Sequence, residues 1–159
     1  MLESLSIRNY VLIDKLDLEF SGGFSAITGE TGSGKSILLG ALSLILGAKA
    51  DKEAIRKGEN SAEVAAVFLS SSPAVISWLD AHDALGDDGE IIIRRSMKMS
   101  GRSSYTVNGI PVSRKEGEEL GSLLVDISSQ HAHQLLLRPG VYVSMVDEAA
   151  GNGALTDAY

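Results

Sequence analysis

Residues 29 to 36 read Gly-Glu-Thr-Gly-Ser-Gly-Lys-Ser, which matches the G-x-x-x-x-G-K-[ST] pattern of a phosphate-binding P-loop. A short apolar run with Ile27 precedes the pattern, and a long apolar segment, residues 37–46, follows it. A P-loop requires this order of strand, loop and helix, because the loop N–H groups and the helix N-terminus converge on phosphate. The alternative is a glycine-rich turn that contains Lys-Ser by chance, and such a turn need not lie between a strand and a helix. The sequence therefore predicts a nucleoside triphosphate site.

The residue types of this loop match the tasks of phosphate binding. The glycines allow tight turns, so that successive N–H groups can point at one phosphate group. Lys35 is expected to reach the β- and γ-phosphates, and the Ser36 hydroxyl to ligate Mg²⁺. The predicted nucleotide-binding residues are Gly29, Glu30, Thr31, Gly32, Ser33, Gly34, Lys35, Ser36 and Ile37.

Composition limits the class of protein. A chain of 159 residues with 44% hydrophobic residues is long enough for one domain with an aliphatic core, since aromatic residues make up only 5%. It has no Cys, no apolar run as long as a membrane span and no signal-peptide pattern at its start, which is typical of a cytoplasmic protein. The net charge of −7 argues against a protein that coats DNA with its whole surface, but leaves a local basic patch possible.

Apolar periodicity predicts a single α/β domain in which a strand pair precedes the P-loop strand. Simple P-loop kinases and GTPases usually begin with the P-loop strand, so the extra pair points to another class. A capping box, Ser113 with Glu116, predicts the start of a helix that runs to about Leu120, and Asn108-Gly109 predicts a turn. The expected strands are 5–7, 16–20, 24–28, 62–69, 91–93, 105–107 and 123–127, with a turn at 14–15 and helices at 36–46 (buried all round), from 73, and at 141–150.

A hydrolytic P-loop site also needs a carboxylate that holds Mg²⁺, and Asp126 is the one candidate that ends an apolar run. No second carboxylate follows it, so an ordinary strand-terminal Asp is the more common explanation. Gln130 is a candidate sensor of Mg²⁺ and γ-phosphate, because an amide oxygen can ligate the metal while its NH₂ orients water. His131 and His133 beside it leave a metal site and a solvated loop as alternatives.

A basic run follows the strand predicted at 91–93. It consists of Arg94, Arg95, Lys98 and Arg102, without an intervening acid. Such a run is compatible with contacts to a nucleic-acid backbone, but a solvated hairpin tip is the more common explanation.

Residues 5–13 and 27–42 resemble the N-terminal head segment of the SMC-like ABC ATPases. Glu30-Thr31 and residues 55–64, 101–103, 107–112 and 126–137, taken in order, narrow the resemblance to the RecN family of bacterial DNA-repair proteins within that group. The resemblance extends from Leu2 to about Gly151. The chain departs from the family pattern at Ser128-Ser129, where His-Gly is usual, and at Ala132, where Glu is frequent.

The resemblance implies a P-loop fold of ABC/SMC type, a head half with an N-terminal antiparallel β subdomain and a core sheet flanked by helices. It implies that Gln130 is the Q-loop glutamine, catalytic together with Lys35, and that it ligates Mg²⁺ together with Ser36. Asp126 then ends the strand before that loop. Residues 1–159 would be the N-terminal part of a head, without the coiled coil and the C-terminal half. The implied cofactors are ATP and Mg²⁺. The implied partners are that half, a second head in a homodimer, and DNA ends or single strands, with no membrane and a nucleoid-associated location.

Overall fold

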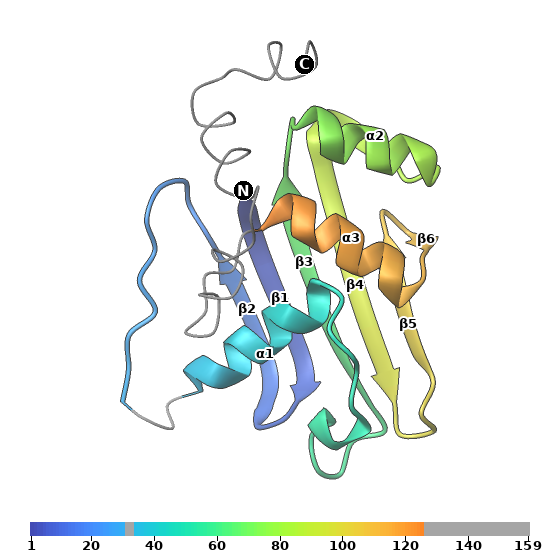
Figure 1. The fold of residues 1–159 in the computed structure, drawn as a ribbon. Coiled ribbons are helices and arrows are strands. Elements are labelled where there is room, and N and C mark those ends of the chain that lie inside the picture. Colours follow the sequence, from blue (N-terminus) through green and yellow to red (C-terminus); the bar gives the residue numbers. More distant parts are fainter. Residues whose placement is uncertain (31–33, 126–159) are drawn as a thin grey trace, which may run out of the picture. The chain divides into compact units, whose positions relative to one another are not determined.

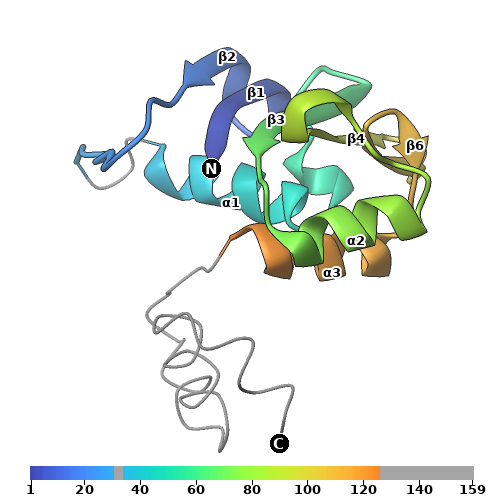
Figure 2. The same cartoon turned by 90° about the horizontal axis from the view of Figure 1, so that it is seen from above.

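A computed structural model describes residues 1–30 and 34–125, and residues 1–125 form one compact unit. Six strands form one antiparallel sheet in the order β2-β1-β3-β4-β5-β6. Helices α1, α2 and α3 all cover the same face of this sheet (Figures 1 and 2). The elements are β1 (Leu2–Tyr10), β2 (Ile13–Glu19), α1 (Lys35–Ile45), η1 (Lys52–Ala54), β3 (Ser61–Leu69), α2 (Pro73–Ala81), η2 (Asp87–Gly89), β4 (Glu90–Lys98), β5 (Ser103–Val107), β6 (Ile110–Pro111) and α3 (Arg114–Leu124).

The core lies between the sheet and its helices. Side chains alternate between the two faces of a strand, so every second residue of β3 and β4 points at the helix layer. In β3 these residues are Ala62, Val64, Ala66 and Phe68, all nearly inaccessible to solvent. The buried residues of β4 are Ile91, Ile93, Arg95 and Met97, so one charged side chain stands in an otherwise apolar row.

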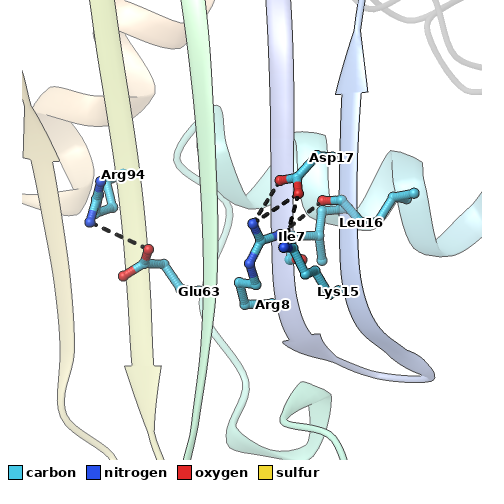
Figure 3. A network of polar contacts seen from close by, with 7 residues as sticks. All are labelled: Ile7, Arg8, Lys15, Leu16, Asp17, Glu63 and Arg94. Carbon is cyan, nitrogen blue, oxygen red and sulfur yellow. Dashed lines mark hydrogen bonds and ion pairs between the residues drawn. The ribbon is translucent and has the colours of Figure 1, made fainter.

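The opposite face of the sheet carries polar side chains and ion pairs (Figure 3). Arg8 Nη2 lies 2.8 Å from Asp17 Oδ1, and Arg94 Nη1 lies 3.5 Å from Glu63 Oε1. The hydrogen bond from Arg8 lowers the pKa of Asp17 below its usual value. These pairs are solvent-exposed, so each contributes little to stability, and positive and negative charges are balanced across the face.

The N-terminal strand pair is confirmed, but its turn is not where the sequence analysis predicted. Asp14 and Lys15 lie inside β2, and the turn is at Val11-Leu12, with Tyr10 opposite Ile13. Val11 has a positive φ of 53°, which is unusual for a β-branched residue. Its N–H donates to the Ala54 carbonyl oxygen at 2.7 Å, so a contact distant in sequence stabilises the turn.

Several local predictions are confirmed. Ser113 and Glu116 form both hydrogen bonds of a capping box at the start of α3. Asn108 and Gly109 have φ values of 47° and 82°, as a two-residue hairpin turn requires. The strand predicted at 123–127 is wrong for its first two residues, because α3 continues to Leu124. The Val125 N–H still donates to the Gly121 carbonyl oxygen, as in a helix. Over the two described ranges, 1–30 and 34–125, the fold offers no helix with the length and apolar character of a membrane span.

Candidate nucleotide-binding site

The site is centred on the N-terminus of α1, where Gly34 is the N-cap residue. Gly34 has a φ of 94°, in the left-handed region that favours glycine, and a Cβ placed there would meet no atom of the described residues within 4 Å. Having no side chain, Gly34 cannot cap the helix itself, and the first turn holds no acidic residue. A helix start of this kind keeps its positive dipole end and its backbone donors directed at an incoming anion.

Lys35 turns its side chain back onto the loop that precedes the helix. Its ammonium donates to the carbonyl oxygens of Gly29 and Glu30, with a distance of 2.8 Å to the oxygen of Glu30. The positive charge therefore lies over residues 29–30, at the start of the P-loop, and at the N-terminal end of α1. A phosphate group entering this loop would meet the ammonium as a point charge.

Ser36 and Ile37 complete the described part of the predicted loop. Ser36 is exposed, so its hydroxyl is available to solvent and to a hydrated cation. The Ile37 N–H donates to the Gly34 carbonyl oxygen at 3.0 Å, which closes the first turn of α1. Backbone donors, an ammonium and a hydroxyl are the groups that triphosphate and Mg²⁺ require, so the residues present fit ATP–Mg²⁺.

The strand expected before the loop, residues 24–28, is not formed. The segment leaves the end of β2 and returns to α1 without joining the sheet (Figure 1). Phe24 is 95% exposed and Ile27 is 52% exposed. A strand needs a neighbour for its N–H and C=O groups, and none of the described strands lies beside this segment.

Helix α1 is present as predicted, but it is not buried on all sides. Ala41, Leu44 and Ile45 face the sheet, whereas Leu39 on the outer side is 59% exposed. Gly40 in the helix interior has a packing role that the sequence analysis missed. A Cβ there would lie 3.2 Å from the Tyr10 hydroxyl oxygen, so the absence of a side chain lets β1 and α1 pack closely.

The remaining predicted residues of the site lie outside the described part of the chain. These are Thr31, Gly32 and Ser33 of the loop, Asp126, Gln130, His131 and His133. The catalytic and metal-binding roles expected for Gln130 therefore stay predictions. In residues 1–30 and 34–125, three or more His, Asp or Glu side chains do not gather into a metal-binding group.

The basic run does not form one surface. Arg94 and Lys98 are exposed, whereas Arg95 is only 4% exposed and lies over the Tyr105 ring, 5.2 Å from its centroid. Burial lowers the pKa of Arg95 from its usual value. Arg94 is paired with Glu63, and Arg102 follows the β4–β5 turn. The four residues are therefore not a single nucleic-acid-binding patch.

Comparison with known proteins identifies the family. The AAA domain family matches residues 4–136, which is most of the chain. The chain belongs to the AAA domain family. It is also similar to DNA repair protein RecN of Vibrio cholerae, with 42% identity over 99% of the chain, and of Bacillus subtilis, with 38% identity over 95%. It spans 28% and 26% of the length of these two relatives, and the resemblance to RecN is confirmed.

Solved structures of SMC and RecF proteins are similar to this chain in fold. An SMC ATPase, studied for ATP-driven dimerization and DNA-stimulated activation, superposes with a TM-score of 0.63 over 92% of this chain and 97% of its own, at 24% identity. The SMC head domain from Thermotoga maritima has a TM-score of 0.57 and 26% identity, over 74% of this chain and 41% of that one. The recombination mediator protein RecF-ATPrS has a TM-score of 0.59 and 25% identity, over 74% and 29%. The fold is that of an SMC- or RecF-type P-loop ATPase head.

Proposed function

We propose that this chain is the ATP-binding N-terminal segment of the head of a RecN-like ATPase that acts in recombinational repair of DNA double-strand breaks. The observation that carries the proposal is the start of α1, where Gly34, the helix N-terminus and the Lys35 ammonium meet. The helix N-terminus and the Lys35 ammonium are groups that bind anionic phosphate, and ATP carries three phosphate groups. The similarity to RecN proteins over nearly the whole chain supports the role in repair.

In this proposal each residue of the loop binds or orients, and none carries out a chemical step alone. Backbone N–H groups of residues 29–36 and the Lys35 ammonium hold phosphate oxygens, and the Ser36 hydroxyl ligates Mg²⁺. Ile37 closes the first turn of α1 behind these groups, since its N–H donates to the Gly34 carbonyl oxygen. Gln130 is assigned to sensing Mg²⁺ and γ-phosphate, as the Q-loop glutamine of the SMC-like pattern.

The site is proposed to be completed by other protein surfaces: a C-terminal head half and the second head of a homodimer. Several large apolar side chains are exposed, among them Phe24 and Ile27 before the P-loop, Leu39 on the outer side of α1 and Leu123 in α3. The proposal assigns them to contacts with these completing surfaces, because an apolar surface that a partner covers is exposed when the partner is absent. An SMC relative of the same fold was studied for ATP-driven dimerization, which supports self-association.

The intact protein is proposed to bind DNA ends or single-stranded DNA. Its proposed location is the nucleoid. Of the four basic residues described above, Arg95 is buried and Arg94 is paired with Glu63, so this chain alone is expected to bind DNA weakly. DNA binding by the intact protein would then depend on surfaces beyond this segment.

The test is ATP hydrolysis by the 159-residue chain, compared with an Asp126→Ala variant. A segment of a composite site should hydrolyse ATP at a rate near background, and Asp126→Ala should change nothing. Robust turnover that Asp126→Ala abolishes would contradict the proposal and indicate a self-contained phosphotransferase that uses this carboxylate for Mg²⁺.

A further inference from the structure

The C-terminal end of α1 is held by a buried hydroxyl from strand β5. Tyr105 in β5 is only 2% exposed, and its hydroxyl donates to the carbonyl oxygen of Ile45, 60 residues away in sequence. The Tyr105 hydroxyl oxygen also lies 3.4 Å from the carbonyl oxygen of Gly117 in α3. The last carbonyls of a helix have no partner within it, so this bond satisfies a group that burial would otherwise leave without one.

The hydroxyl can act as a donor over the whole physiological pH range. Burial raises the pKa of Tyr105 above its usual value, so the proton stays on the oxygen. The Arg114 side chain adds a second contact at the same end of α1, because its Nη1 donates to the Gly47 carbonyl oxygen at 3.2 Å. A positive charge at a helix C-terminus also interacts favourably with the helix dipole.

Three glycines bring α3 close enough for these contacts to form. A Cβ at Gly117 would lie 2.4 Å from Cζ of Tyr105, and one at Gly121 would lie 2.8 Å from the Leu46 carbonyl oxygen. A Cβ at Gly47, just after α1, would lie 2.6 Å from the backbone of Glu118. The end of α1, strand β5 and the first turns of α3 are therefore packed without space for a side chain between them.

We propose that Tyr105 is a positioning residue for the nucleotide site: by holding the last turn of α1, its hydroxyl sets the direction in which that helix presents Lys35 and Ser36. An eleven-residue helix is about 16 Å long and moves as a rigid body, so a tilt at one end displaces the other. The described residues before α1, 20–30, form no strand and therefore do not tie the start of this helix to the sheet. This inference rests on the proposed function, because the ligand is the nucleotide bound at the P-loop.

The test is Tyr105→Phe, which removes the hydroxyl and leaves the ring. We expect ATP–Mg²⁺ to bind at least threefold more weakly, measured by calorimetry. In nucleotide-free protein we expect faster hydrogen exchange at the amides of Ile37 and Leu38, which bond to the Gly34 carbonyl oxygen at the start of α1. Exchange in β3 and β4 should stay unchanged.

The matched control is Ile91→Val, which removes one methyl group from a fully buried side chain of β4. It should lower the unfolding midpoint without changing the ATP affinity or the exchange at Ile37 and Leu38. Unchanged affinity and unchanged exchange in Tyr105→Phe, or equal changes in both variants, would overturn the inference. If wild-type protein does not bind ATP, the proposed function fails, and the exchange measurement, which needs no nucleotide, still decides whether Tyr105 positions α1.

Discussion

Arg94 and Arg95 are neighbours in β4, yet their side chains lie on opposite faces of the sheet. Arg94 is exposed and paired with Glu63 at 3.5 Å, whereas Arg95 is 4% exposed, lies against the Tyr105 ring and has a buried Nε without a hydrogen-bond partner in the described part of the chain. The sequence shows two identical side chains side by side. The strand gives them different environments, because its side chains alternate.

Replacing these two arginines should therefore have different consequences. We expect Arg94→Gln to change the free energy of unfolding by less than about 0.5 kcal/mol, as for other exposed ion pairs. Arg95→Met should leave stability unchanged or raise it by up to about 1 kcal/mol, because burying a cation without an ionic partner is costly. The measurement is urea unfolding followed by the fluorescence of Trp78, the single tryptophan, which is 9% exposed. A loss of more than about 2 kcal/mol in Arg95→Met would mean that this guanidinium has a partner that stabilises the fold.

Gly117→Ala should destabilise the protein, because the new Cβ would lie 2.4 Å from the Tyr105 ring. Forcing an extra methyl group into a packed region typically costs about 1–3 kcal/mol. The matched control is Gly22→Ala, where the new atom would only touch Met1 Sδ at 3.7 Å and should change stability by less than about 0.5 kcal/mol. Equal unfolding midpoints for the two variants would show that α3 can move away from β5 at little cost.

The capping box at the start of α3 should make stability depend on acid pH. The hydrogen bond from the Ser113 backbone N–H lowers the pKa of Glu116 below its ordinary value of 4.5. A carboxylate whose pKa is lower in the folded state stabilises the fold above pH 4.5, and this contribution is lost as the pH falls through the lower, folded-state pKa. Glu116→Gln, which does not titrate, should show a smaller drop in urea midpoint between pH 6 and pH 3 than wild type. Identical drops would contradict a role for this carboxylate.

The features that local chemistry specifies could be predicted from the sequence. The capping box needs only Ser113 and Glu116, and the hairpin turn needs only Asn108 and Gly109, so both are confirmed. The P-loop lysine could likewise be assigned from its motif, and the structure places it over the loop, next to the start of α1.

The errors concern contacts between segments that are distant in sequence. The turn at Val11-Leu12 depends on a hydrogen bond to Ala54, which no local pattern reveals. Residues 24–28 have the composition of a strand, but a strand forms only where a neighbour offers its backbone groups. The sequence predicts Tyr105 only as a residue of a strand, because its bond to Ile45 joins two positions 60 residues apart.

The central claim is that residues 29–37 bind ATP–Mg²⁺ through the start of α1. Calorimetric titration of the 159-residue chain with ATP–Mg²⁺ tests it most directly, with Lys35→Ala and the control Lys49→Ala, an exposed lysine that follows α1. We predict that Lys35→Ala weakens binding at least tenfold, about 1.4 kcal/mol, while Lys49→Ala binds as wild type does. Equal affinity in Lys35→Ala and wild type would contradict a nucleotide site at this loop.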